Sequence, residues 1–197
     1  MKVLGINGSA RKDGNTAILI KEVFRELNSE GIETELYQLA GAEIRHCMAC
    51  RACRENQDRK CIIGEDALNS LIEKMIDADG IILGSPTYFA NISSGMKAFI
   101  DRAGLVAMGN GYLLRRKPAA AVVAVRRGGG MDAFNALNHF FLANQMIVAG
   151  SSYWNIAWGG KPGDVLSDEE GIRTMKNLGI NMAWLLKSLN GQTLERR

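Results

Sequence analysis

Short apolar runs alternate along the chain with longer segments in which apolar residues recur at helical spacing. In residues 66–78, for example, Leu68, Leu71, Ile72 and Met75 fall on one face of a helix. The strand-like runs cover residues 3–7, 33–39, 80–84, 119–125 and 150–155. The helix-like segments cover residues 16–29, 66–78, 95–106, 131–148 and 168–189. Five strand–helix units in succession predict an α/β fold: a doubly wound, five-stranded parallel sheet with helices on both faces.

Length and composition favour a single domain over residues 1–197, with a cysteine-rich loop at residues 40–64. The chain is 47% hydrophobic, which is enough for a large core. No run of about 18 apolar residues predicts a membrane span, and a core strand that begins near residue 2 leaves no room for a signal peptide. The formal net charge of +3 is scattered, whereas nucleic-acid binding needs a concentrated basic face. We therefore expect a cytoplasmic protein without membrane or nucleic-acid partners.

A small-polar loop at residues 8–16 joins the first predicted strand to the first predicted helix. Backbone N–H groups and a helix N-terminus attract anions there, and Ser9, Asn15 and Thr16 add neutral donors, with Arg11 as one nearby cation. The loop is not a Walker loop, because Asn15 stands where the lysine belongs, and it lacks the Rossmann glycine fingerprint. Neutral donors suit a bound monophosphate that is not transferred. The alternative is a turn that binds nothing, in which Asn15 or Thr16 is a helix N-cap.

Two further loops follow the third and fourth predicted strands, at the edge where such sheets bind ligands. The loop at residues 85–97 offers aromatic surface at Tyr88 and Phe89. The loop at residues 126–130 offers glycine backbone that a flat ring could approach closely. A phosphate and a planar heteroaromatic at adjacent loops indicate a mononucleotide. The alternative for Tyr88 and Phe89 is packing in the core.

All four cysteines of the chain, Cys47, Cys50, Cys53 and Cys61, lie in one segment with spacings of two, two and seven residues. Zinc sites with four cysteines usually have two separated pairs, whereas this run suits a [4Fe–4S] cluster. Basic residues nearby would lower the thiol pKa values and favour ligation; they are Arg45, His46, Arg51, Arg54, Arg59 and Lys60. A zinc site and a thiol loop without metal remain alternatives.

Residues 8–16, Gly-Ser-Ala-Arg-Lys-Asp-Gly-Asn-Thr, resemble the phosphate loop of the NAD(P)H-dependent FMN reductase family, in the flavodoxin-like superfamily. Residues 85–88, Ser-Pro-Thr-Tyr, with the Gly-x-Lys-x-Phe-Ile-Asp-Arg run at residues 95–102, are similar to that family's second signature. The cysteine run is similar to that of the iron–sulfur flavoproteins. These motifs cover the first half of the chain, and the order of elements matches to the end.

The resemblance implies a flavodoxin-like fold and assigns residues to FMN. Its phosphate would be held by Ser9, Arg11, Asn15 and Thr16. The ribityl chain and ring would be lined by Pro86, Thr87, Tyr88, Phe89 and Asn91, and approached from another side by Arg127, Gly128 and Gly129. The family pattern also includes Lys97, Asp101 and Arg102, which we interpret as structural or as part of a subunit contact.

The expected activity follows from the cofactor, because FMN accepts a hydride from NAD(P)H and can release electrons singly. No catalytic side chain is expected, since the sequence has no Ser/His/Asp constellation or carboxylate pair. We expect an FMN-dependent oxidoreductase with a nicotinamide or ferredoxin-type donor and a small acceptor such as a quinone. The alternative is a flavodoxin-type electron carrier, although such carriers are usually shorter and strongly acidic. We also expect a homodimer or homotetramer built on Tyr153, Trp154 and Trp158; in a monomer these side chains would instead cap the core.

Overall fold

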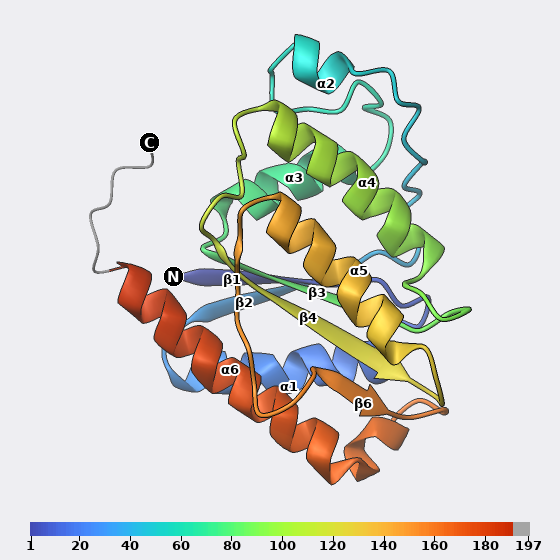
Figure 1. Cartoon of the computed structure of the whole chain (residues 1–197), viewed down its shortest axis with the longest axis vertical. Helices are drawn as coiled ribbons and strands as arrows, with labels where there is room; N and C mark the ends of the chain where they lie inside the picture. Colours follow the sequence, from blue (N-terminus) through green and yellow to red (C-terminus); the bar gives the residue numbers. More distant parts are fainter. Residues whose placement is uncertain (191–197) are drawn as a thin grey trace.

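A parallel β-sheet with helices on both faces forms the centre of the computed structural model, which describes residues 1–190 (Figure 1). The strand order is β2-β1-β3-β4-β5, with β6 also paired to β4. The strands are β1 (Lys2–Asn7), β2 (Glu33–Gln38), β3 (Gly80–Pro86), β4 (Pro118–Val125), β5 (Ile147–Val148) and β6 (Ile156–Trp158). The predicted doubly wound, flavodoxin-like α/β fold is confirmed.

Two layers of helices cover the sheet. The helices are α1 (Asn15–Ser29), α2 (Ala52–Glu55), α3 (Leu68–Asp77), α4 (Ser94–Gly109), α5 (Gly130–Ala143), a 3-10 helix η1 (Asp164–Ser167) and α6 (Glu169–Asn190). Helices α1 and α6 pack against each other and share one apolar core with the sheet. Helices α3, α4 and α5 share the core on the opposite face. All eight residues of β4 are buried between these layers, which explains its almost wholly apolar sequence.

The fifth position of the sheet differs from the prediction. Residues 150–155 form a loop, and two short strands flank it: β5 pairs with the start of β4, and β6 pairs with its end. Helix α5 stops at Ala143, five residues before the predicted end, and Gln145 then takes a left-handed backbone with a φ of 57°. Ser151 Oγ lies 2.5 Å from both Tyr153 O and Asn155 Oδ1. Such local hydrogen bonds compete with strand pairing, so the strand is interrupted.

The strand ends position the predicted sites. Strands β1, β3 and β4 are parallel neighbours, so the loops that follow them meet at one edge of the sheet. The chain after β2 instead runs away from this edge and reaches α2, which lies far from α6 at the opposite end of the molecule (Figure 1). Among the described residues, no helix has the length and apolarity needed to cross a membrane.

Candidate functional site

The loop after β1 is shaped by polar side chains at the ends of two strands. Asn7 Nδ2 donates to Gln38 Oε1 at 2.6 Å, and Asn7 Oδ1 accepts from the Ser9 N–H at 3.0 Å. Gln38 Nε2 donates to Ser9 O at 2.7 Å, and Ser9 Oγ accepts from the Arg11 N–H at 3.1 Å. The buried Ser9 is therefore fixed from both strands, while Arg11 is exposed. Sequence reasoning missed Asn7 and Gln38, although each is a polar residue at the end of an apolar or alternating run.

Helix α1 begins without a side-chain cap. Its N-cap is Gly14, in an extended conformation, so the expected alternative in which Asn15 or Thr16 is the N-cap is wrong. Asn15 Nδ2 donates to Lys161 O at 2.9 Å, and its Oδ1 accepts from the Gly163 N–H at 2.8 Å, so this amide holds the loop before η1. An uncapped first turn presents its N–H groups and the positive end of the helix dipole to an anion.

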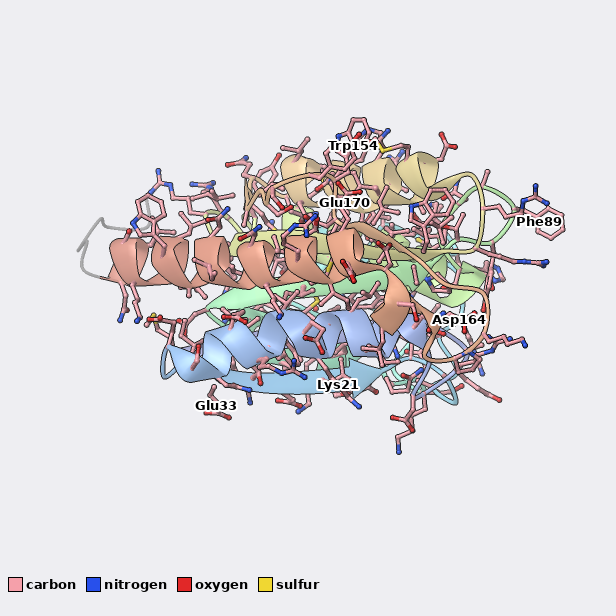
Figure 2. The ribbon with its side chains drawn as sticks, turned by 90° about the horizontal axis from the view of Figure 1, so that it is seen from below. Lys21, Glu33, Phe89, Trp154, Asp164 and Glu170 are labelled. Carbon is pink, nitrogen blue, oxygen red and sulfur yellow. The ribbon has the colours of Figure 1, made fainter. Side chains whose placement is uncertain are left out.

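A two-residue hairpin projects from the end of β3. Tyr88 and Asn91 exchange backbone hydrogen bonds of 2.8 and 3.0 Å around Phe89 and Ala90. Both turn residues have left-handed backbones, with φ values of 46° and 57°, which is a strained conformation outside glycine. Phe89 is fully exposed and points away from the molecule (Figure 2). Tyr88 is also exposed, so the alternative of core packing for these two rings is wrong.

The hairpin is in contact with the loop after β4. Gly129 has a φ of 79°, and a Cβ placed there would lie 2.5 Å from Ala90 Cα and 3.3 Å from Thr87 Cγ2. The Oγ1 atom of Thr87 is buried and has no hydrogen-bond partner within the described part of the chain. Arg127 and Gly128 are exposed beside Gly129. Two of the three predicted loops therefore touch, and they leave a buried hydroxyl group without a partner.

Helix α4 connects this group of loops to the phosphate loop. Ser93 Oγ donates to Gly8 O at 2.6 Å and accepts from the Met96 N–H as the N-cap of α4. Two observations indicate that these loops fit FMN. The uncapped start of α1 suits a phosphate, and the unpartnered Thr87 hydroxyl suits a polar ligand atom. The donor set therefore fits the cofactor. The individual FMN contacts stay predictions.

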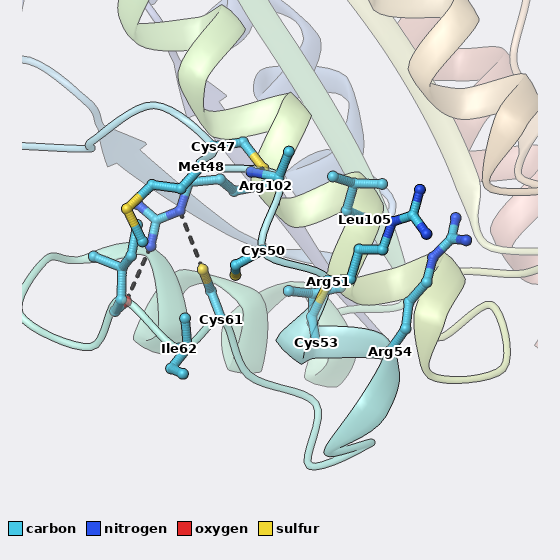
Figure 3. A pocket seen from close by; sticks show the side chains of 13 residues that line it. Cys47, Met48, Cys50, Arg51, Cys53, Arg54, Cys61, Ile62, Arg102 and Leu105 are labelled. Carbon is cyan, nitrogen blue, oxygen red and sulfur yellow. Dashed lines mark hydrogen bonds between the residues drawn. The ribbon is translucent and has the colours of Figure 1, made fainter.

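The four cysteines line one cavity of about 260 Å³ (Figure 3). The cavity also contains Arg51, Arg54 and Arg102, and its apolar wall includes Met48, Ile62, Leu105 and Val106. All four thiols are free. Four non-glycine residues of this loop have left-handed backbone conformations: Ala49, Arg51, Gln57 and Arg59. Such strain persists only where surrounding contacts impose the conformation, and it is concentrated at functional sites.

Surrounding side chains fix the cysteine loop. Asn69 donates to Cys61 O and accepts from its N–H, at 2.9 and 2.8 Å. Asn110 Nδ2 donates to Cys53 O at 3.0 Å. Two donors reach sulfur itself: the Ala49 N–H lies 3.4 Å from Cys47 Sγ, and Arg102 Nε lies 3.3 Å from Cys61 Sγ. Hydrogen bonds to ligand sulfurs are typical of iron–sulfur sites.

The cavity lies over the middle and C-terminal half of α4. Arg102, Leu105 and Val106 form its floor, and a Cβ at Gly109 would lie 2.9 Å from Arg54 Cγ. Helix geometry puts Arg102 about 12 Å along the axis from Ser94, where α4 meets the phosphate loop. The loop after β2 begins at the same sheet edge as the phosphate loop, as expected, because β2 ends beside β1 at Gln38. The cysteines themselves lie farther along, against the second half of α4.

The pKa of the Cys53 thiol is not lowered by the basic residues as expected. Burial raises the pKa of the Cys53 thiol, and the neighbouring Cys61, Cys50 and Cys47 raise it further. The expected lowering of thiol pKa values is wrong for this residue, because Arg51 and Arg54 are exposed and hydrated while Cys53 is half-buried.

A buried ion pair stands beside the cavity. Arg102 and Asp66 are both almost fully buried and form a salt bridge. Burial favours the neutral carboxyl group, but hydrogen bonds from Arg102 and from the N–H groups of Arg45 and Leu68 outweigh it and hold the pKa of Asp66 below its usual range. By contrast, Lys97 and Asp101 form an exposed ion pair one turn apart on α4. The interpretation of Arg102 as structural agrees with its burial.

Across residues 1–190, no group of three or more His, Cys, Asp or Glu side chains is arranged to hold a metal ion. The cysteines share a cavity without converging on one point. The chemistry of the donor set, four thiols with two hydrogen-bond donors to sulfur, nevertheless fits an iron–sulfur cluster.

A parallel sheet in this strand order, with an anion cradle after β1, defines a flavodoxin-like protein. Residues 1–160 match the family described as NADPH-dependent FMN reductase. An iron–sulfur flavoprotein of Methanocaldococcus jannaschii is 40% identical over 95% of this chain and 98% of its own length. One from Archaeoglobus fulgidus is 35% identical over 93% and 90%, respectively.

The solved structures agree on the fold. A flavodoxin from the domain Archaea superposes with a TM-score of 0.63 at 16% identity, covering 95% of this chain and 99% of its own. The chain belongs to the NADPH-dependent FMN reductase family, whose members are flavodoxin-like, FMN-binding oxidoreductases.

Proposed function

We propose that this chain is an iron–sulfur flavoprotein that carries FMN at the loops after β1, β3 and β4 and a [4Fe–4S] cluster in the cysteine cavity. The phosphate would be bound by Ser9, Thr16 and the first turn of α1, with Arg11 nearby. Asn15 would act mainly by holding the loop before η1 against this turn. FMN can exchange electrons in pairs or singly, so it suits a donor of one kind and an acceptor of the other.

The cysteine cavity is the observation that carries the proposal. Four thiols from one loop line it, and the sulfurs of Cys47 and Cys61 receive hydrogen bonds. Asn69 also bonds to the peptide groups of Cys61, and Asn110 bonds to the carbonyl oxygen of Cys53. Four strained, non-glycine backbone conformations cost free energy, and a bound ligand would compensate that cost. The names of the relatives support the same assignment.

The test is the content of protein purified without oxygen and then reconstituted. We expect about four iron atoms and four acid-labile sulfides per chain, together with one FMN. Cys50→Ser should lose most of the iron and keep FMN, because Cys50 lines a cavity whose described lining includes no residue of the proposed flavin loops. Ser70→Ala, an exposed change on α3, is the matched control and should keep both.

A second candidate is a cluster-free NAD(P)H-dependent quinone reductase, which the family match over residues 1–160 favours. Wild-type protein with FMN and quinone reductase turnover but with no iron would establish that candidate in place of the first. NAD(P)H oxidation without any partner protein would also exclude the flavodoxin-type carrier. A protein that accepts electrons only from reduced ferredoxin would identify the donor as ferredoxin-like.

We also propose that the chain forms a homodimer or a homotetramer. Tyr153, Trp154 and Trp158 are each about half exposed and line a cavity of about 350 Å³ beside β6 and the loop after β4. These side chains do not cap the core, and aromatic residues are enriched in interface cores. Light scattering at micromolar concentration tests this: a dimeric or tetrameric mass is expected, and a monomeric mass would refute it.

A further inference from the structure

Arg102 is the largest fully buried polar side chain beside the cysteine cavity, with 1% of its surface exposed. It lies on α4, and every nitrogen of its guanidinium group has a partner. Nε donates to Cys61 Sγ at 3.3 Å, one terminal nitrogen donates to Asp66 and to Arg45 O, and the other donates to Ile63 O at 3.0 Å. Figure 3 shows the guanidinium group facing the Cys61 sulfur from inside the cavity.

We propose that Arg102 sets the reduction potential of the cysteine site, by donating the Nε–H hydrogen bond to the Cys61 sulfur in the loaded protein. This inference rests on the proposed [4Fe–4S] cluster. Arg102 is a positioning residue in this role: it acts through Cys61, and it keeps the potential higher than that of the same four thiolates without this donor.

The physical reason is the charge that reduction adds. An electron that enters a thiolate-ligated cluster increases the negative charge on its sulfurs, and a hydrogen bond from a cation stabilises the reduced form more than the oxidised form. The effect is strong where solvent is excluded, since a buried charge is screened far less than an exposed one. Arg102 is such a charge, and its guanidinium group is held in place by Asp66 and by the carbonyl oxygens of Arg45 and Ile63.

The other arginines of the cavity provide the contrast. Arg51 and Arg54 line the same space, but both are exposed, and neither has a hydrogen bond to sulfur in the described structure. The Ala49 N–H donates to Cys47 Sγ from the backbone, so side-chain substitutions leave that donor in place. Arg102 is thus the one side chain within residues 1–190 that donates to a cysteine sulfur here.

Lysine cannot replace this geometry. Its ammonium group is a single point of charge, whereas the guanidinium group holds Asp66, two carbonyl oxygens and the sulfur at once in a fixed plane. Arg102→Lys therefore keeps the positive charge but should lose the bond to Cys61. Arg54→Lys makes the same chemical change at an exposed position on the same cavity.

The experiment compares wild type, Arg102→Lys and Arg54→Lys, all purified without oxygen with FMN and cluster in place. Electrochemical titration followed by electron paramagnetic resonance gives the midpoint potential of the cluster. We expect a lower cluster potential in Arg102→Lys, an unchanged one in Arg54→Lys, and the same FMN potential in all three. A cluster potential in Arg102→Lys equal to that of the wild type would overturn the inference.

A second measurement needs no variant, in case Arg102→Lys fails to fold or to retain iron. Wild-type protein labelled with 15N-arginine should show a magnetic coupling between the reduced cluster and one arginine nitrogen, and no coupling would overturn the inference. The proposed function fails differently, by an absence of iron from the reconstituted wild type. If iron is present and the coupling is absent, the proposed cluster is supported and the proposed role of Arg102 is refuted.

Discussion

Gly129→Ala should disturb the proposed flavin site through backbone strain and through overlap with the neighbouring hairpin. Gly129 has a φ of 79°, and a left-handed backbone costs a non-glycine residue about 1–2 kcal/mol. The new Cβ would also lie 2.5 Å from Ala90 Cα and 2.7 Å from Ala90 Cβ, so the hairpin at Tyr88–Asn91 must shift. Overpacking of this kind costs about 1–3 kcal/mol. We expect the free energy of unfolding to fall by about 2–5 kcal/mol from the two effects together.

Gly128→Ala is the matched control. The position lies next in sequence, a Cβ there meets no atom within 4 Å, and its φ is not left-handed. Urea unfolding of the two apoproteins should therefore separate them, with Gly128→Ala within about 0.5 kcal/mol of the wild type. FMN titration should also show weaker binding by Gly129→Ala, since the Thr87 hydroxyl moves with the hairpin. A Gly129→Ala protein as stable as Gly128→Ala would mean that the hairpin does not rest on this loop.

Three further predictions concern single contacts. Asp66→Asn should destabilise the apoprotein at neutral pH. The pKa of Asp66 in the folded protein lies below its unfolded value of about 3.9, so the stabilisation by this carboxylate is lost as the pH falls through the folded pKa. The unfolding curves of variant and wild type should therefore converge in acid. Convergence of the two unfolding curves at high pH instead would contradict a lowered pKa of Asp66. Asn15→Ala should cost about 1–2 kcal/mol by freeing two hydrogen bonds to the loop before η1, and calorimetry that finds no loss would disprove the link. Phe89→Gly should raise stability by about 1 kcal/mol, because the left-handed strain disappears and an exposed ring loses no packing, while FMN affinity falls; unchanged affinity would remove Phe89 from the flavin site.

The layers of the fold could be predicted because each element has its own pattern. The buried run of β4 and the helical face of α3 are explicit in the sequence, and parallel units then allow few arrangements. The fifth strand could not be placed, because its interruption depends on the local hydrogen bonds of Ser151 and on the early end of α5. Two strands of two and three residues leave no periodic signal.

The sequence predicted where the candidate site lies in the fold, while its ligand contacts stay predictions. Ser9 is buried in the loop before α1, Thr16 is buried in the first turn, and the helix begins without a side-chain cap. The second use of Asn15, to hold a loop almost 150 residues away, has no local signature. The contact of Gly129 with Ala90 also has no local sequence signature, because it depends on how the loops after β3 and β4 meet.

Helix α4 gives the two sites a common frame. Its N-cap Ser93 bonds to Gly8 of the phosphate loop, Arg102 at its middle bonds to Cys61, and Asn110 at its end bonds to Cys53. The run at residues 95–102 therefore serves as a rigid spacer between the loop after β1 and the cysteine loop. Because a helix resists bending far more than a loop does, the separation of the two loops within one chain is set by the number of residues in α4. For the proposed iron–sulfur flavoprotein, this means that a change in electron exchange between cluster and flavin would have to come from the loops at either end of α4, or from a second chain of the proposed oligomer.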